Sequence, residues 1–491
     1  MSPFKWSILA AVILLAVVAG GAYLLSPRGD FDVRDAAVAA TEDELYDLIP
    51  PELRYEADPP PESDNAHPLW AEAFSIAAGI DDEPWQDLLH DWETDLLATE
   101  REKDRLPEGE SREAMLQWLA EYEVVFEMLA EALKRPEAYI PDDALPPEEF
   151  PWEWSWARGF RAMASITNLH MRLAVMEGDV ATAMEKGELL LRTANRVLEA
   201  DAFMIHQLLA GSVSAAVTPH LVHLAAHPDT TEAQRRDLLK LFDPSTSSLP
   251  AITQAANREF NQLVPMLVEI AEDIRRGRSM HDDDIEMFPD EAALLERMWR
   301  YGYAPLDTQQ TVLEASRRLQ ELMQMLQRHG ARTEVGQWRD ELVETRDRLN
   351  EIADRAMERG RLPRPRHERH NLYGRQILLD TILVGSSTAT TVLRHDARMR
   401  VAHLGVALCI YEKEHASLPG ALDDLVAAGL IEAVPRDPFD GEALRYSPRH
   451  RVVWSVGQMG PDHIRDGIEQ EDLDRYLDTS QASIILPAIG E

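Results

Sequence analysis

Apolar side chains recur three and four positions apart along most of the chain, the spacing that gathers them on one face of an α-helix. The pattern dominates from Pro68 to about Gly374, where clusters of Pro, Gly and Asp interrupt it and alternating β-type runs are scarce. It predicts a mainly α protein whose central part, residues 67–374, is a helical domain. Ser111 to Lys134 is predicted as one such helix, with Ser111 as its N-cap.

Two stretches of this domain predict antiparallel helical hairpins. Trp156 to Met176 and Val180 to Leu198 are joined at Gly178, which permits the chain reversal. This hairpin is similar to one tetratricopeptide-like unit, although no further clear copy follows it. A second hairpin is predicted from Thr308 to Arg328 and from Val335 to Arg359. Loops are predicted at residues 243–250 and 281–290.

An uncharged apolar run, Ile8 to Leu25, lies near the N-terminus. As a helix it is about 27 Å long, close to the roughly 30 Å hydrocarbon layer of a bilayer. Lys5 precedes it, whereas acidic residues offset Arg28 after it, so the positive-inside rule puts the start in the cytoplasm. Residues 1–30 are therefore predicted as a single-pass anchor in the cell membrane, with the bulk of the chain extracytoplasmic, in the periplasm.

A cleaved signal peptide is the alternative interpretation of the same run. Its most apolar part, Ile8 to Val18, is short, and Gly20-Gly21-Ala22 offers small residues suited to a signal peptidase. Both interpretations export the remaining chain. After the run, residues 31–66 alternate acidic patches with Pro50-Pro51 and Pro59-Pro60-Pro61, which predicts an extended linker with a short helix.

In the last part of the chain, residues 375–491, helical spacing gives way to turns and strand-like runs, which predicts a small α+β module. Ala397 to His415 is a predicted helix, and Ala443 to Tyr446 and Arg451 to Val456 are predicted strands. Between them lie four residues typical of a structural turn: Asp437, Pro438, Asp440 and Gly441. Asp accepts backbone N–H groups, Pro fixes φ and Gly permits positive φ.

The order of YEKEHASLPGALDDL, VPRDPFDGEALRY and VVWSVGQMGPD resembles the globular domain of the major pseudopilins of type II secretion systems. The resemblance covers about 90 residues, from Ala397 to about Ile468. The chain as a whole resembles bacterial envelope proteins that carry such a tail and have no assigned activity. The N-terminus lacks the processed Gly-Phe start of a pseudopilin and the Glu at its fifth position, so the resemblance does not extend to filament assembly.

The pseudopilin resemblance also implies a calcium loop after the last strand. Met459 stands where the family often has an acidic ligand, and Asp462 and Asp466 remain as oxygen ligands. A hard cation takes about six to eight such ligands. Two interpretations stay open: a calcium site on Asp462 and Asp466, or acids that solvate the loop.

Charge and cysteine content narrow the classes of partner and chemistry. With 49 Lys plus Arg against 87 Asp plus Glu, the formal net charge of the 491-residue chain is −38. Such an excess repels polyphosphates, so nucleic acid is not expected as a partner. Cys409 is the one cysteine. It permits no intrachain disulfide and lies among apolar residues, which predicts core packing.

Three groups of residues have candidate chemistry. His220, His223 and His227 share a predicted helix face and could ligate a metal, or pack and cap the helix end. His281 precedes three Asp residues in a predicted acidic loop. Trp152, Trp154 and Trp156 alternate, as in a sugar-stacking platform or an anchor for the first hairpin.

No catalytic or cofactor-binding motif is found among Gly-x-Ser-x-Gly, His-Glu-x-x-His, phosphate-loop and dinucleotide patterns. The leading hypothesis is therefore a membrane-tethered extracytoplasmic helical scaffold or adaptor that contacts other envelope proteins. An exported hydrolase or metal-dependent enzyme, with its site near His220, His223 and His281, is the alternative. A sugar-binding envelope receptor that uses Trp152 to Trp156 is a third hypothesis.

Overall fold

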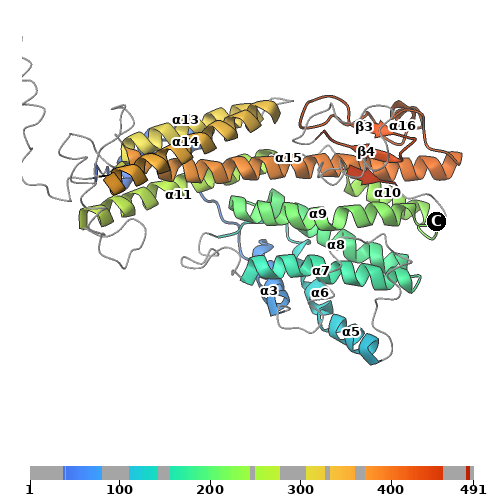
Figure 1. Cartoon of the computed structure of the whole chain (residues 1–491). Coiled ribbons are helices and arrows are strands. Elements are labelled where there is room, and N and C mark those ends of the chain that lie inside the picture. Colours follow the sequence, from blue (N-terminus) through green and yellow to red (C-terminus); the bar gives the residue numbers. More distant parts are fainter. Residues whose placement is uncertain are drawn as a thin grey trace, which may run out of the picture. The chain divides into compact units, whose positions relative to one another are not determined.

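The structure is a computed structural model of the chain and describes residues 37–38, 40–79, 110–141, 155–243, 249–276, 306–326, 332–359, 371–456 and 483–486. Most of these residues are helical (Figure 1), which confirms the mainly α class. The predicted anchor, residues 1–30, lies outside the described residues and stays a prediction.

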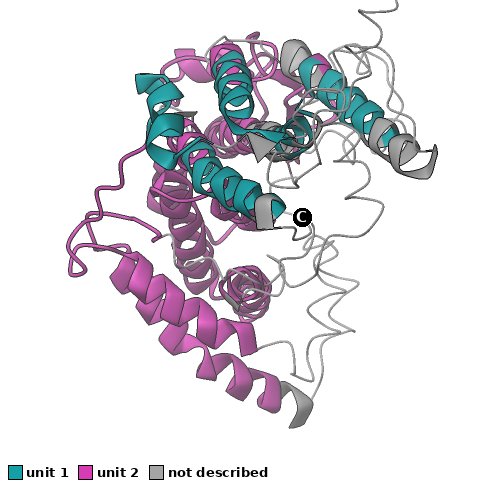
Figure 2. Ribbon diagram, turned by 90° about the vertical axis from the view of Figure 1, so that its left-hand side faces the viewer, with its two compact units in different colours: residues 1–54, 259–321, 338–384 teal, residues 55–258, 322–337, 385–491 magenta. Residues whose placement is uncertain are grey.

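The chain divides into two compact units, each assembled from segments far apart in sequence (Figure 2). Unit 1 comprises residues 1–54, 259–321 and 338–384, and unit 2 comprises residues 55–258, 322–337 and 385–491. The domain limits predicted from the sequence follow the chain linearly instead, at residues 30, 66 and 374. Local sequence patterns do not indicate which distant helices pack together.

Unit 1 is built from helices and one minimal sheet. Its elements are β1 (Ala37–Val38), α2 (Glu42–Leu48), the 3-10 helix η2 (Pro51–Leu53), β2 (Leu306–Asp307), and parts of α11 (Leu249–Arg276), α13 (Thr308–Leu326), α14 (Arg332–Arg359) and α15 (Leu372–His415). β1 and β2 pair in parallel. The helices α13 and α14 confirm the two helices predicted for the second hairpin, within a few residues at each end, whereas the connection across Gly330 lies outside the described residues.

Part of the predicted linker is packed into unit 1. Thr41 caps α2 in a capping box, and Leu45, Ile49 and Leu53 are buried. The backbone carbonyl of Leu53 accepts a 2.8 Å hydrogen bond from Nδ2 of Asn261. Leu45 lies in α2, Ile49 is the extended residue that ends it, and Leu53 ends η2, so a helix, its cap and a 3-10 turn all contribute buried side chains although the surrounding composition is acidic and Pro-rich. This stretch is therefore not a free tether.

Unit 2 contains the remaining described elements. They are α3 (His67–Ala77), α5 (Glu110–Glu121), α6 (Glu123–Ala132), α7 (Ser155–Met176), α8 (Val180–Glu199), α9 (Met204–Ala226), α10 (Glu232–Leu241), α16 (Asp423–Ala427), β3 (Arg445–Ser447), β4 (Val452–Trp454) and β5 (Ser483–Ile485). The helices α7, α8 and α9 pack on one another, and α3 and α6 cover one side of this layer (Figure 1).

The first predicted hairpin is confirmed, whereas the helix predicted before it is interrupted. Gly178 adopts a φ of +78° between α7 and α8, and the side chain of Asp179 caps α8. In contrast, the helix predicted from Ser111 to Lys134 breaks into α5 and α6 at Tyr122, whose ring packs edge-on against Trp118 at 5.0 Å. Ser111 lies inside α5 rather than at its cap, because the helix already begins at residue 110.

A buried guanidinium joins the loops of unit 2. Arg258 is fully buried, its Nη1 lies 3.2 Å from Oδ1 of Asp201, and its Nη2 donates a 2.6 Å hydrogen bond to the carbonyl of Ile140. The rings of Tyr139 and Phe203 face the guanidinium at 4.9 and 4.3 Å. Ion pairing, hydrogen bonding and cation–π contact together compensate the desolvation of the charge.

The last strands form an antiparallel sheet in the order β3-β4-β5. This confirms the two predicted strands, with bounds shifted by one or two residues. The sheet and α15 share one hydrophobic core with α7, α8 and α9, to which Leu408, Leu444 and Val453 belong. Gly405 of α15 faces Val222 of α9, where an added Cβ would lie 2.9 Å from a methyl carbon. Residues 385–456 therefore do not have a core of their own.

Among the described helices, α9 is the one with the length and apolar character to cross a membrane. More than half of its most apolar window is buried inside the protein, and Val213, Val217 and Leu221 belong to the common core of unit 2. This environment is typical of a core helix in a folded unit.

Candidate functional site

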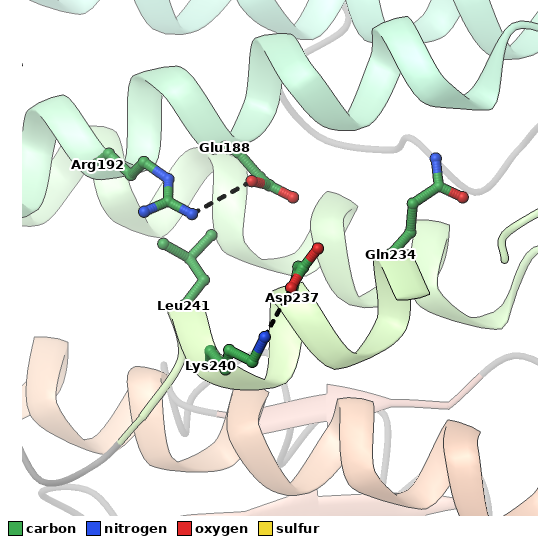
Figure 3. Close-up of a pocket in the computed structure, with 6 residues that line it drawn as sticks. All are labelled: Glu188, Arg192, Gln234, Asp237, Lys240 and Leu241. Atoms are coloured by element: carbon green, nitrogen blue, oxygen red, sulfur yellow. Dashed lines mark hydrogen bonds and ion pairs between the residues drawn. The ribbon is translucent and has the colours of Figure 1, made fainter. Parts of the chain in front are cut away.

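A polar groove lies between α8 and α10 within unit 2 (Figure 3). Its volume is about 310 Å³. Two side chains come from α8 and four from α10. The lining residues are Glu188, Arg192, Gln234, Asp237, Lys240 and Leu241.

A buried arginine fixes the position of α10. Arg235 is 2 % exposed, and its guanidinium donates hydrogen bonds of 2.6 and 2.9 Å to the carbonyls of Ala225 and His227 at the end of α9. These carbonyls are among the last of the helix, which have no partner within it. Burial lowers the pKa of Arg235, whereas the two carbonyl acceptors stabilise the charged guanidinium.

The contact of Arg235 with α9 also determines where the other side chains of α10 lie. Arg235 reaches the end of α9 and Leu238 is fully buried, and residues 234, 237 and 241 form the adjoining helical face, which lines the groove with α8. Gln234 also completes a capping box with Thr231, whose backbone N–H it accepts at 2.8 Å. The capping box of Thr231 and Gln234 and the buried guanidinium of Arg235 therefore both fix the position of α10.

Each helix pairs its own charges along the groove. Nη2 of Arg192 lies 3.4 Å from Glu188 on α8, and Nζ of Lys240 lies 2.9 Å from Asp237 on α10. Burial raises the pKa of Glu188, Arg192 opposes this rise, and Asp237 and Glu185 add to it. Glu188 is the least exposed of the four charged side chains, at 21 %, whereas Lys240 is 77 % exposed.

The composition of the groove suits recognition. Its lining combines two carboxylates, two cations, one amide and one aliphatic side chain. Carboxylates and cations accept and donate charge-assisted hydrogen bonds, which give specificity at partly exposed sites. The lining residues include no His, Cys or Ser, so the lining supplies no imidazole, thiol or serine hydroxyl group.

The predicted turn residues lie together in a hydrogen-bonded corner. Oδ1 of Asp437 accepts the N–H of Phe439 at 2.9 Å, and Oδ1 of Asp440 accepts the N–H of Glu442 at 3.0 Å. Pro438 lies between the two acids, and Gly441 has a φ of +76°.

Asp437 also reaches beyond the turn. Its carboxylate accepts hydrogen bonds from Oγ of Ser455 at 2.9 Å and from the N–H of Val456 at 2.7 Å, just after β4. Burial raises the pKa of Asp437 although three hydrogen-bond donors oppose the rise. The fully buried carboxylate thus fastens the turn to the end of the central strand.

The predicted calcium ligands, Asp462 and Asp466, lie outside the described residues, as does the whole segment 457–482. The calcium interpretation therefore stays a prediction. In the part of the chain that the structure describes, no three His, Cys, Asp or Glu side chains form a group that could hold a metal ion.

The three histidines on the predicted helix face occupy different environments. His220 and His223 lie within α9, whereas His227 is its C-cap residue and has left the helical backbone conformation. Nδ1 of His227 accepts the N–H of Asp229 at 3.3 Å. His227 therefore belongs to the turn after the helix, and the three imidazoles do not continue one helical face.

The aromatic and cysteine candidates are buried where they are described. Trp156 is 4 % exposed and packs edge-on against Phe74 and His206, at 5.1 and 4.8 Å. It anchors the start of α7 and offers no open stacking face. Cys409 is 2 % exposed, and burial raises its pKa to about 12, which confirms core packing. His281, Trp152 and Trp154 lie outside the described residues.

The groove has no clear signature in the sequence. Glu188 and Arg192 are four residues apart, and Asp237 and Lys240 are three apart, which is an ordinary pattern for exposed helix faces. The one sequence feature that sets this helix apart is Arg235, which directly follows Gln234, a residue of the capping box. Comparison of the chain with models of protein families, with curated proteins and with solved structures finds no match.

Proposed function

We propose that this protein is a membrane-tethered, extracytoplasmic helical adaptor that binds another envelope protein at the groove between α8 and α10. The observation that carries the proposal is the groove itself, with both signs of charge on two helices, one of which, α10, a buried arginine fastens to the end of α9. Fixed, partly exposed charges of both signs favour specific recognition of a protein surface.

Two features of the sequence support the location in this proposal. The uncharged run from Ile8 to Leu25, with Lys5 before it, supports an anchor and an exported bulk. The pseudopilin-like tail supports a place among envelope assemblies, in which such modules contact other proteins. Its sheet packs on α15 inside the same core as α8, so a tail of this kind would be carried together with the groove.

Photo-crosslinking in native membranes tests the adaptor function. A photoreactive amino acid is placed at Gln234 in the full chain, and in a matched variant at Arg236, an exposed residue of the same helix that pairs with Glu232. We expect a protein adduct from position 234 and not from position 236, because only the former lines the groove. Absence of an adduct at position 234, or equal adducts at both positions, would reject the adaptor site.

A further inference from the structure

The two carboxylates of the groove lie on opposite helices and face each other. Figure 3 shows Glu188 and Asp237 as neighbours, with Arg192 beside Glu188 on α8 and Lys240 beside Asp237 on α10. The charge of Asp237 acts on Glu188 across the groove and helps to raise its pKa. The groove therefore presents two neighbouring carboxylates, each with a cation of its own helix beside it.

The existing pairs are weak enough to yield to a partner. Both join residues of one helix, at i,i+4 and i,i+3, and Arg192 and Lys240 are 51 and 77 % exposed. Exposed pairs of this kind are worth roughly 0.2 to 1 kcal/mol. A ligand that brings a cation to the two carboxylates and a carboxylate to the cations would relieve the repulsion between Glu188 and Asp237 and replace the weak pairs.

The groove is small for a cofactor. A volume of about 310 Å³ is near the lower limit of small-molecule sites, which run from about 300 to 1,000 Å³. Neither face carries an aromatic ring, since Leu241 is the one apolar lining residue. Such a space suits two polar side chains of a segment that lies across it.

We propose that the groove binds a segment of a partner protein that carries one basic and one acidic side chain close together. The basic side chain lies between Glu188 and Asp237, and the acidic one pairs with Arg192 and Lys240. The methylene groups of the basic side chain pack on Leu241. The inference rests on the proposed adaptor function and names the chemistry of its partner.

Selection from a random peptide display library tests this charge pattern. The full chain in detergent is the bait, and we expect enriched peptides that combine a Lys or Arg with an Asp or Glu within a few residues. An enriched peptide is then measured against the variant Glu188→Gln/Asp237→Asn, in which the groove loses both carboxylates. Its affinity should fall about tenfold, as when a charge loses its partner at a partly exposed interface.

The matched control is Glu131→Gln/Glu232→Gln, which removes the same amount of charge from exposed ion pairs of α6 and α10 outside the groove. It should keep the affinity within about twofold. An equal loss in both variants would reduce the binding to general electrostatics and overturn the inference. Thermal unfolding of each variant separates lost binding from lost folding.

Other outcomes distinguish the inference from the function on which it rests. Enriched peptides without the charge pair, or no enrichment over the matrix alone, would overturn the partner chemistry while an adduct at position 234 still supports the adaptor. If free arginine or glutamate displaced the peptide and bound as tightly as the peptide does, the groove would be a small-molecule site, and the proposal of a protein partner would be overturned. Failure of both experiments would reject the groove as a binding site.

Discussion

Arg258 and Asp201 are 57 positions apart in the sequence, and their side chains form an ion pair of 3.2 Å. Only the acid reaches solvent, with 17 % of its side chain exposed. The pair joins α11 to the connection between α8 and α9. Through Tyr55, whose hydroxyl donates a 2.9 Å hydrogen bond to Asp201, it also holds the segment that precedes α3.

Replacement of Arg258 by Met should lower the free energy of unfolding by about 3 to 5 kcal/mol, because it leaves the Asp201 carboxylate poorly compensated. Tyr55→Phe should cost about 1 kcal/mol, since it removes one hydrogen bond. Urea titration followed by circular dichroism measures both. Arg236→Gln, which breaks an exposed pair on α10, is the control and should cost less than 1 kcal/mol. A similar cost for both arginines would contradict the role of the buried pair.

Gly159 should not tolerate alanine. An added Cβ would overlap the backbone carbonyl of Phe74, where α7 passes closest to α3. Backbone cannot move aside as a flexible side chain can, so Gly159→Ala should destabilise by about 3 kcal/mol, at the upper end of the range for overpacking. Gly79→Ala is the control, because nothing lies within 4 Å of its added Cβ. Thermal unfolding would contradict the close approach if both variants melted together.

Two buried histidines should make the stability depend on acid. Burial lowers the pKa of His395 to about 3 and that of His170 to about 4, whereas the unfolded chain titrates near 6.5. The unfolded state therefore binds protons first as the pH falls. Their contribution is complete above about pH 6.5 and is lost progressively toward pH 4 and then 3.

Urea titrations between pH 7.5 and 5 measure this dependence. By pH 5 the loss should be about 1 to 2 kcal/mol for each buried histidine. His395→Leu should reduce the slope between pH 6.5 and 5 by the contribution of this one histidine, and His415→Asn at an exposed position is the matched control. An unchanged slope in His395→Leu would show that this imidazole is accessible to protons in the folded state.

Asp437→Ala should destabilise by about 2 to 4 kcal/mol, because it strands the donors of Phe439, Ser455 and Val456 in a buried corner. This exceeds the 0.5 to 2 kcal/mol typical of a local cap. Asp440→Ala is the comparison, since its carboxylate is partly exposed and serves the turn and Arg445. Unfolding monitored by tryptophan fluorescence ranks them, and equal losses would argue against the link to β4.

Leu14→Arg should release the protein from membranes. A central arginine costs about 2.5 to 3.5 kcal/mol on insertion scales, which is enough to impair a single short span. Alkaline extraction of membranes and protease added from outside the cytoplasm give the readout, and Ser7→Arg at the margin of the run is the control. Recovery of a soluble mature chain that starts near Tyr23 would show that the run is a signal peptide.

The parts of the fold that the sequence predicts are those that adjacent residues determine. Gly178 and Asp179 specify the α7 to α8 reversal locally, through a positive φ and an N-cap, and the hairpin follows. Asp437 and Gly441 mark their turn in the same way. The break at Tyr122 has no such local signal. The apolar spacing of α5 continues into α6, and the contact between the rings of Tyr122 and Trp118 is visible only in the structure.

Features that depend on distant residues cannot be read in this way. Leu45 and Ile49 sit in an acidic stretch that reads as a tether, and their burial depends on helices about two hundred positions later. The groove depends on Arg235 reaching the carbonyls of Ala225 and His227, which sets the rotation of α10 against α8. Each lining residue alone is an ordinary charge on a helix surface.

The pairing of β4 has a consequence for synthesis of the protein. One side of β4 pairs with β3, which directly precedes it, but the other side pairs with β5 at Ser483–Ile485. At ~5 to 20 residues per second, the ribosome leaves that second edge open for roughly a few seconds. An open edge of Val452, Val453 and Trp454 is a template for the strand of another chain. Nascent copies on one messenger are therefore most at risk of exchanging β5 in that interval, and a chain cut short before Ser483 would keep the adhesive edge permanently.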